Sequence, residues 1–318
     1  MIDFRYHLVS IVAIFLALAL GIILGSTTLS QSVTKGLQRQ TSSLARSNEE
    51  LRQSQARMEA QLKGDESFAR AMGPHLVADR LNGQSVVFME TPGASNDSIE
   101  QLSALAKSAG ATVTGRVTVQ KKFLDDNQTG TIDELANQLR PAAMAFPEGS
   151  GPYEKAAAVL ASAVVTRDGA MTGREDASAA SVLGGFRQAG YVTVSGKPGQ
   201  HATLAVMIAP SSLYAYEGGD SDNRALLALA AALDGTGRGT VVGGPSTAAQ
   251  KGGLIAALRD SDTVKSVSSQ DTVDTASGQV VTILALQNEL SGRSGRYGTG
   301  SGVNGYLPSP VPAAGGSG

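Results

Sequence analysis

The 318-residue sequence is 42% hydrophobic and 17% charged, with a formal net charge of −2, so it has room for a membrane anchor and one or two folded domains. The near-neutral charge argues against nucleic acid as a partner, because phosphate binding needs a concentrated basic surface. The chain has no cysteine, which excludes disulfides, thiolate metal sites and cysteine nucleophiles.

The first predicted element is a membrane anchor at residues 8–26. Residues 8–25 are an unbroken apolar run, and no Asp, Glu, Lys or Arg lies between Arg5 and Lys35. About eighteen residues at roughly 1.5 Å each give about 27 Å of helix, close to the thickness of the hydrocarbon core. The run is longer than that of a secretory signal and lacks a small-x-small cleavage site, so an uncleaved anchor is favoured. Residues 1–7 are then a cytoplasmic leader, and the rest of the chain is expected outside the cytoplasm.

Small residues recur along the anchor. Ala13, Ala17, Gly21 and Gly25 are spaced four apart and fall on one stripe of the helix. Such a stripe lets two helix backbones approach closely in lipid, which favours self-association. The alternative is that Ala and Gly are simply common in membrane helices.

A polar segment at residues 27–72 carries a heptad repeat and predicts a coiled-coil helix. Its apolar residues recur every seven positions, with an asparagine at one inner position. The predicted seam consists of Leu37, Leu44, Asn48, Leu51, Met58 and Leu62. A buried asparagine at such a position is typical of parallel dimers, so we expect a parallel homo-oligomer, most simply a dimer. The alternative is a single amphipathic helix that folds back on the following domain.

Residues 73–290 predict an extracytoplasmic α/β domain. Gly73 and Pro74 are expected to end the preceding helix. Strands are predicted at 85–89, 111–119, 191–194, 204–208, 240–242 and 280–286. Helices are predicted at 96–108, 152–165, 178–189, 223–233 and 247–258. This alternation favours a mostly parallel, Rossmann-like sheet with helices on both faces. From residue 291 to residue 318 the sequence is rich in Gly, Ser and Pro, which predicts a flexible tail.

Three of the predicted strands end in similar loops of Gly, Pro and small hydroxyl residues. The loop residues are Thr91, Pro92 and Gly93, then Pro210 and Ser211, and then Gly243, Gly244 and Ser246. Ligands usually lie beyond the carboxyl ends of parallel strands, so these loops are the candidate walls of a binding crevice. The alternative is ordinary turn chemistry, in which Ser211 or Ser246 caps the next helix.

The sequence contains no recognisable catalytic or metal-binding motif. His7, His75 and His201 stand in no such pattern, and the seven methionines are scattered, without the Met-x-x-Met spacing that suits Cu(I). The acidic pairs at 125–126 and 220–222 do not continue into an oxygen-ligand loop. We therefore expect no catalytic residue and no bound cofactor, leave the metal ligands unknown, and predict that the chain is not an enzyme.

Four segments resemble the actinobacterial family named for the mycobacterial copper transport protein MctB. They are MIDFRYHLVSIVAIFLALALGIILGS at the N-terminus, the polar helix after it, SVVFMETPGASND, and TILALQNELSGRSGRYGTG. The most specific are the anchor with its leader and the closing L-x-G-x-x-G-x-Y-G-T-G at residues 290–300. The resemblance covers roughly residues 1–300.

The resemblance implies a role in copper homeostasis, as transport or pore formation at the outer envelope. It also implies a cell-envelope setting shared with a second membrane or envelope protein. Two hypotheses follow. The chain contributes to copper efflux, with copper implied only by the resemblance, or it is a dimeric envelope scaffold that binds a membrane partner and regulates cell separation or cell-wall remodelling.

Overall fold

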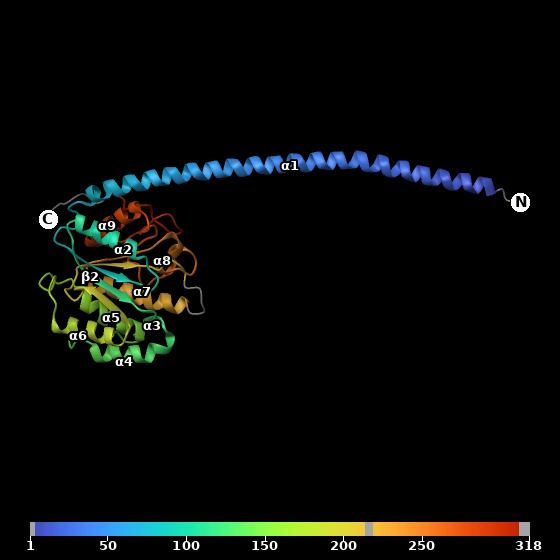
Figure 1. The fold of residues 1–318 in the computed structure, drawn as a ribbon. Helices are drawn as coiled ribbons and strands as arrows, with labels where there is room; N and C mark the ends of the chain where they lie inside the picture. The colour runs from blue at the N-terminus through green and yellow to red at the C-terminus, as the bar shows by residue number, and fades with distance from the viewer. Residues whose placement is uncertain (1–3, 214–218, 312–318) are drawn as a thin grey trace. The chain divides into compact units, whose positions relative to one another are not determined.

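The computed structural model describes residues 4–213 and 219–311, without the side chains of residues 26–36 and 219–221 (Figure 1). The helices are α1 (Phe4–Val77), α2 (Asn96–Ser108), α3 (Lys121–Leu124), α4 (Thr129–Leu139), α5 (Pro152–Val164), α6 (Ala177–Gln188), α7 (Gly219–Thr236), α8 (Leu254–Asp260) and α9 (Ala276–Leu290). Short 3₁₀ turns occur at Asp126–Gln128 and Ser246–Ala249. The strands are β1 (Ser85–Glu90), β2 (Thr112–Val119), β3 (Val192–Gly196), β4 (Leu204–Ile208), β5 (Thr240–Gly243), β6 (Ser268–Gln270) and β7 (Arg296–Tyr297).

The chain divides into two compact units, at residues 1–65 and 66–318. The described part of the first unit is a single helix, the N-terminal part of α1. Its segment Phe4–Gly25 is long and apolar enough to cross a membrane, with a mean hydropathy of 2.9. The predicted seam residues from Leu37 onward are exposed in this helix; those with large apolar side chains are Leu37, Leu44, Leu51, Met58 and Leu62. The structure therefore confirms the helix, while the coiled coil stays a prediction.

The second unit is built on one sheet with the strand order β3-β2-β1-β4-β5-β6-β7. All neighbouring strands are parallel except β3, which pairs antiparallel with β2. The first six strands follow the order of doubly wound dinucleotide-binding sheets, in which the order reverses between the first and fourth strands. The predicted α/β class and mostly parallel sheet are thus confirmed.

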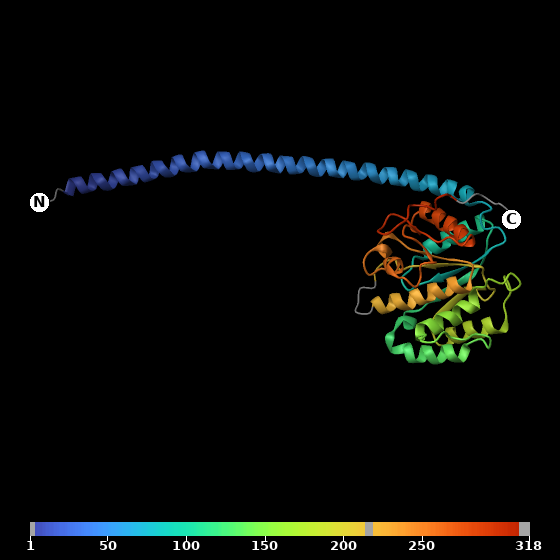
Figure 2. The same cartoon turned by 180° about the vertical axis from the view of Figure 1, so that it is seen from behind.

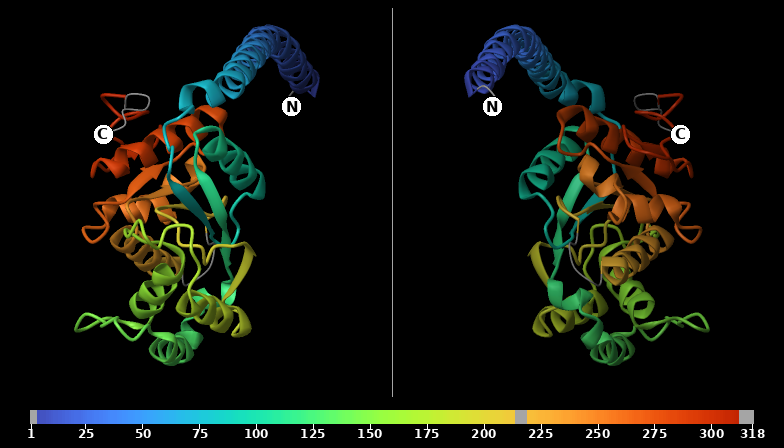
Figure 3. Two further views of the ribbon diagram at one scale, coloured as in Figure 1. Left: turned by 90° about the vertical axis from the view of Figure 1, so that its left-hand side faces the viewer. Right: turned by 90° about the vertical axis from the view of Figure 1, so that its right-hand side faces the viewer.

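Helices cover both faces of this sheet and create two apolar cores (Figure 1; Figure 2; Figure 3). On one face, α2, α9 and the end of α1 pack over side chains such as Phe88 and Val206. On the other face, α4, α5, α6, α7 and α8 pack over Met89, Met207 and Val242. The central strands β1 and β4 contribute to both cores, because successive side chains of a strand point to opposite faces. They are therefore apolar along nearly their whole length.

The predicted helix break at Gly73-Pro74 is wrong, because α1 continues through both residues to Val77. Gly73 is buried, and a Cβ there would lie 3.1 Å from Val280 Cγ2 on α9. The absent side chain lets the last turns of α1 pack closely on α9 and α2. This packing outweighs the lost backbone hydrogen bond at Pro74.

The predicted strand at 280–286 is also wrong, because these residues lie in α9. Twelve of the fifteen residues of α9 are buried, so the helix lies between the sheet and the end of α1 with almost no exposed side. A helix buried all round loses the 3.6-residue polar pattern and resembles a buried strand in sequence. Its N-terminus is capped by the Thr275 side chain, which accepts a hydrogen bond from Gly278 N.

The predicted helix at 247–258 is divided in the structure into the 3₁₀ turn at Ser246–Ala249 and α8. Gly252, with a φ of 87°, reverses the chain between them. At Gly253 a Cβ would collide with Ala248 O, so the two pieces lie close together. The glycine pair that joins them therefore breaks the helical period.

The predicted flexible tail is wrong for residues 291–311. This segment adds β7 to the edge of the sheet, and Tyr297 is 4% exposed. Few apolar residues are buried here, and hydrogen bonds to buried polar groups fix the segment instead. Residues 312–318 lie outside the described residues, as do residues 1–3 of the predicted leader.

Candidate functional site

The structure brings the three predicted crevice loops together at the carboxyl ends of β1, β4 and β5. Thr91 N and Thr91 Oγ1 both donate to Ile208 O, at 3.2 Å and 2.8 Å. Ser211 N donates to Gly93 O at 2.9 Å, so the loops after β1 and β4 are joined by their backbones. Pro210 lies beside Gly93, where a Cβ would be 3.9 Å from Pro210 Cβ. Pro92 is buried in the same junction.

The third loop closes against the other two. Ala209 N donates to Gly243 O at 2.7 Å, and Thr247 Oγ1 donates to Ser211 O at 2.9 Å. At Gly244 a Cβ would lie 2.9 Å from Ala209 Cβ, so only glycine allows this approach. A cavity beside Pro210, which Asn223 and Leu254 also line, measures about 10 Å³ among the described residues, room for about one water molecule. The described loops thus form a packed junction.

The expected capping role of Ser246 is wrong. The 3₁₀ turn that begins at Ser246 has Pro245 at its N-cap position and no side-chain cap. Ser246 is exposed. Ser211 takes part in the junction through its backbone N and O.

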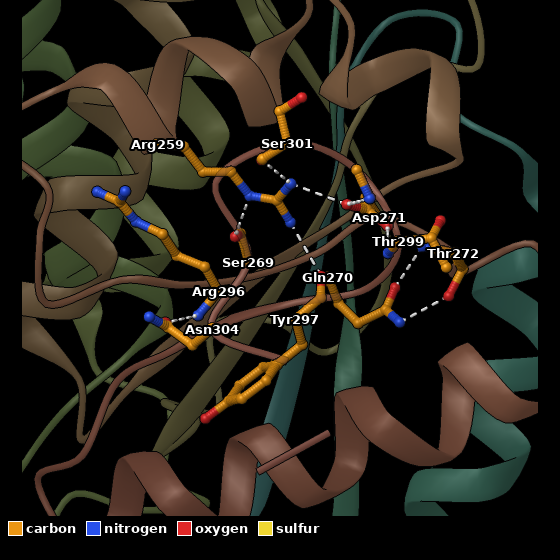
Figure 4. Close-up of polar contacts among 11 residues, drawn as sticks. Arg259, Ser269, Gln270, Asp271, Thr272, Arg296, Tyr297, Thr299, Ser301 and Asn304 are labelled. Carbon is orange, nitrogen blue, oxygen red and sulfur yellow. Dashed lines mark hydrogen bonds and ion pairs between the residues drawn. The ribbon is translucent and has the colours of Figure 1, made fainter. Parts of the chain in front are cut away.

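A buried ion pair lies near this junction, under the C-terminal segment (Figure 4). Arg259 Nη1 lies 2.8 Å from Asp271 Oδ2, and the two side chains are 3% and 0% exposed. Arg259 also donates to Ser269 Oγ, Tyr297 O and Ser301 O at 2.9 to 3.0 Å. These contacts join α8, β6, β7 and the loop after β7. Because a buried charge is stable only when paired and hydrogen-bonded, the surroundings of both groups must be complete.

The closing motif of the sequence forms the other half of this site. Thr299 N donates to Asp271 Oδ1 at 2.8 Å, and Gly300 N donates to Asp271 Oδ2 at 2.9 Å. Gly298 has a φ of 125°, and a Cβ there would collide with the Asp271 carboxylate. The Y-G-T-G segment therefore wraps its backbone around one carboxylate, and its glycines are required by that approach.

A second buried acid supports the opposite end of β6. Glu289 Oε1 accepts hydrogen bonds from Ser268 N, at 3.1 Å, and from Ser268 Oγ. Burial raises the pKa of Glu289 from its ordinary value of 4.5 to about 8, although the bonds from Ser268 oppose this shift. Burial also raises the pKa of the neighbouring Asp234, and the bond from Ser266 opposes it. Glu289 is thus held as a neutral hydrogen-bonding group near pH 7.

The histidines provide no metal centre. His201 is buried, and its ring nitrogens lie 2.8 Å from Arg174 O and 3.1 Å from Ser162 O. His7 and His75 are exposed on α1. Across residues 4–213 and 219–311, the structure places no three His, Asp or Glu side chains together as a metal site.

The methionines at the strand ends serve the core. Met89 and Met207 face each other across β1 and β4, and both are fully buried. They pack among aliphatic side chains. Their thioethers fill space there, as methionine commonly does.

The pairing of Arg259 with Asp271 was not predicted from the sequence. An arginine in the otherwise apolar stretch LIAALR of α8 was one available signal, because a charged residue on a buried face needs a partner. The partner was not visible, since β6 is the polar stretch Ser-Ser-Gln and does not resemble a buried strand. The glycines of the Y-G-T-G segment could be seen in the sequence, but the Asp271 carboxylate that they approach could not be identified from it.

The structure defines a class of protein, in which a doubly wound α/β domain follows a helix with a membrane-length apolar segment. Residues 1–308 match the family described as "Copper transport outer membrane protein, MctB", and the chain belongs to this MctB family. The copper transporter MctB of Mycobacterium tuberculosis (strain H37Rv) is 29% identical over 313 residues, which cover 95% of this chain and 98% of the relative. That of Mycobacterium leprae (strain TN) is 29% identical over 314 residues, with the same coverage.

Proposed function

We propose that this chain contributes to copper efflux or copper tolerance at the cell envelope, as a membrane-anchored protein without enzymatic activity. Membership of the MctB family and the names of its mycobacterial relatives support the link to copper. The observation that carries the anchoring role is the membrane-length apolar segment Phe4–Gly25 at the start of α1. In this proposal copper is cargo, and the chain holds no copper of its own.

One such helix does not form a conduit. Residues 8–25 carry no charged side chain, and their stripe of Ala13, Ala17, Gly21 and Gly25 offers a packing face without polar side chains. Ions cross a bilayer only where polar groups replace their hydration shell or where water fills the path. We therefore propose that copper passes through an assembly in which this chain packs against copies of itself and against a second membrane protein.

The proposed topology places the N-terminus in the cytoplasm and residues 27–318 outside it. The absence of cysteine is compatible with an oxidising exterior. Alkaline phosphatase fused after Gly83 should be active, because this enzyme needs export. Activity of a cytoplasm-only reporter at the same position would contradict the topology.

The copper role is tested in cells. A deletion strain should accumulate more copper than the parent strain and grow less well on added copper, and the intact gene should restore both properties. Substitution of Gly21 and Gly25 by Leu should fail to restore them, while Leu at Ile14 and Ile22 serves as a matched control. A deletion strain with unchanged copper content would contradict the proposal.

A second candidate function is a dimeric envelope scaffold that regulates cell separation or cell-wall remodelling. One observation favours it. The N–H of Ala276, at the start of α9, donates a bifurcated hydrogen bond to Glu66 Oε1 and Oε2, at 3.0 Å and 2.9 Å; Glu66 lies eight residues past Met58. The last turns of α1 are therefore fastened to the domain, as a support that carries it would require. A deletion strain that forms chains of unseparated cells at normal copper content would select this function.

The predicted dimer has a direct test. Because the chain has no cysteine, Leu44→Cys and Asn48→Cys each introduce a single thiol. In membranes under oxidising conditions, both should give a covalent dimer, since seam positions face each other in a parallel coiled coil. Ser47→Cys, outside the seam, is the matched control. A monomer at all three positions would contradict the dimer.

A further inference from the structure

A cavity of about 440 Å³ opens beside Arg259, between α8, the turn before it and the segment after β7. Its volume is that of a small-molecule site. Small residues form much of its wall, namely Ala249, Gly252, Ala256, Ala257 and Gly302. Polar side chains complete it, namely Asn223, Lys251, Arg259, Asp260, Arg296 and Ser301. None of these described lining residues is aromatic.

The cavity carries two cations that the described side chains do not neutralise. Among the side chains that the structure describes, those of Lys251 and Arg296 form no ion pair and no hydrogen bond. Arg296 is held through its backbone, where Arg296 N donates to Asn304 Oδ1 at 2.8 Å and Arg296 O accepts from Asn304 N at 2.7 Å. The third cation, Arg259, is already paired with Asp271. Asp260 is the one acidic residue of the lining, and it is exposed.

Asn223 adds an unused acceptor to the same wall. The residue is 4% exposed, and Asn223 Nδ2 donates to Gly252 O at 3.0 Å. Asn223 Oδ1 has no hydrogen-bond partner among the described residues. Buried polar atoms are rarely left unpaired, so this oxygen indicates a donor beyond the described residues, which a bound ligand can supply.

We infer that this cavity binds a small organic phosphate that carries hydroxyl groups, of the sugar phosphate class. A phosphate monoester has a charge of about −1.5 to −2 at pH 7, which matches Lys251 and Arg296. The guanidinium of Arg296 offers two parallel N–H donors to two phosphate oxygens, and Lys251 offers a point charge. A ligand hydroxyl supplies the donor for Asn223 Oδ1. A nucleotide fits less well, because no aromatic ring among the described lining residues is present to stack on a base.

The binding experiment uses the full chain in phosphatidylcholine nanodiscs. Glucose 6-phosphate is titrated by isothermal calorimetry, with glucose and inorganic phosphate as separate probes. Glucose 6-phosphate should bind most tightly, inorganic phosphate more weakly, and glucose not measurably. Repeating the titration in nanodiscs with added phosphatidylinositol distinguishes the source of the phosphate, because competition by this lipid identifies a headgroup and its absence identifies a soluble ester.

Two variants locate the site. Lys251→Gln with Arg296→Gln removes both free cations and should weaken glucose 6-phosphate binding at least about tenfold, as expected for lost charged hydrogen bonds. Ser301→Glu keeps both cations but adds a carboxylate at the exposed rim, and should weaken binding in the same direction. The matched control, Lys197→Gln with Arg187→Gln, removes the same charge from exposed positions on β3's side of the domain and should leave affinity unchanged.

Folding of each variant is checked by the near-ultraviolet circular dichroism of its tyrosines. No binding of glucose 6-phosphate to the natural sequence at millimolar concentration overturns the inference. Unchanged affinity in the Lys251→Gln, Arg296→Gln variant overturns it as well, as does an equal loss in the control. The outcome is independent of the copper proposal, since none of these probes contains a metal.

Discussion

The centre of the sheet and its β6–β7 end are held by different interactions. At the centre, β4 is Leu-Ala-Val-Met-Ile, fully buried between two apolar cores, and burial of these side chains stabilises it. At the other end, β6 is Ser-Ser-Gln, equally buried, and its neighbours are Arg259, Asp271 and Glu289. The first region tolerates changes that preserve volume, whereas the second depends on complete pairing of each polar group.

The largest effect is expected from Asp271→Ala at the polar end. It leaves the Arg259 guanidinium buried without its partner and frees Thr299 N and Gly300 N, which should lower the free energy of unfolding by about 3 to 5 kcal/mol. Urea denaturation followed by near-ultraviolet circular dichroism measures this loss. Hydrogen exchange should rise first in residues 291–311, because the carboxylate fixes that segment.

A double variant separates pairing from space filling. Arg259→Met with Asp271→Leu removes both charges and should be less destabilising than Asp271→Ala alone, because no unpaired charge remains. If the double variant loses more stability than Asp271→Ala, the ion pair itself stabilises residues 291–311. In that case the penalty of an unpaired buried charge does not explain the sensitivity of the polar end.

At the centre, Leu204→Ala should lower the free energy of unfolding by about 2 to 5 kcal/mol, since Leu204 is fully buried and its loss leaves a cavity. The same urea titration applies. Here exchange should rise throughout the domain, without a preference for residues 291–311. Selective release of the C-terminal segment would show that the two regions are not independent.

The Glu289 carboxyl predicts a pH dependence. Its pKa is about 8 in the folded state and about 4.5 when exposed, so across that interval the unfolded state releases a proton that the folded state retains. The contribution of Glu289 to stability is therefore fully present below about pH 4.5 and is lost as pH rises toward 8, by at most about 1.4 kcal/mol per pH unit.

Glu289→Gln tests this dependence, because a glutamine Oε1 still accepts from Ser268 and does not titrate. The variant should lose stability less steeply than the natural sequence between pH 5 and pH 7 in urea titrations. Parallel slopes for the two proteins would show that Glu289 is not protonated in the folded state. Glu148→Gln, at an exposed position, is the matched control.

The smallest effect is expected at the end of α1. Glu66→Gln replaces the charged acceptor of Ala276 N and also loses the ion pair with Arg70, at 2.8 Å, which is largely exposed. Capping contacts of this kind contribute about 1 kcal/mol, and exposed pairs add little. Thermal unfolding should shift slightly downward, and Glu59→Gln, on the exposed part of α1, should leave it unchanged. An equal shift in both variants would show that Glu66 does not stabilise α9.

The central half of the fold was predictable because its signals are local. Residues 204–208 are an apolar run of strand length between turn residues, and the strand occupies those same positions. The loops that contain Thr91, Pro210 and Gly243 come together because parallel neighbouring strands end at one edge of the sheet. Their close packing depends on backbone hydrogen bonds that no sequence pattern reveals.

The polar end was not predictable, because its signals are pairwise. Arg259 and Asp271 can pair only because α8 and β6 are adjacent in the fold. Gly298 is required only because its backbone lies against the Asp271 carboxylate. The helix at residues 276–290 was mistaken for a strand for a related reason. Its almost complete burial comes from neighbours that are distant in sequence, so its own composition carries no polar face.

The position of β7 at the edge of the sheet has a consequence for synthesis in the cell. The ribosome synthesises the chain from its N-terminus, so β1 to β6 are made before residues 296–300. Until then the edge of β6 is unpaired, and the Asp271 carboxylate lacks its bonds from Thr299 N and Gly300 N. An unpaired strand edge can form hydrogen bonds with strands of other chains. A ribosome that stops early, or a protease that trims past Tyr297, would thus leave a product that quality-control systems can distinguish from the finished protein.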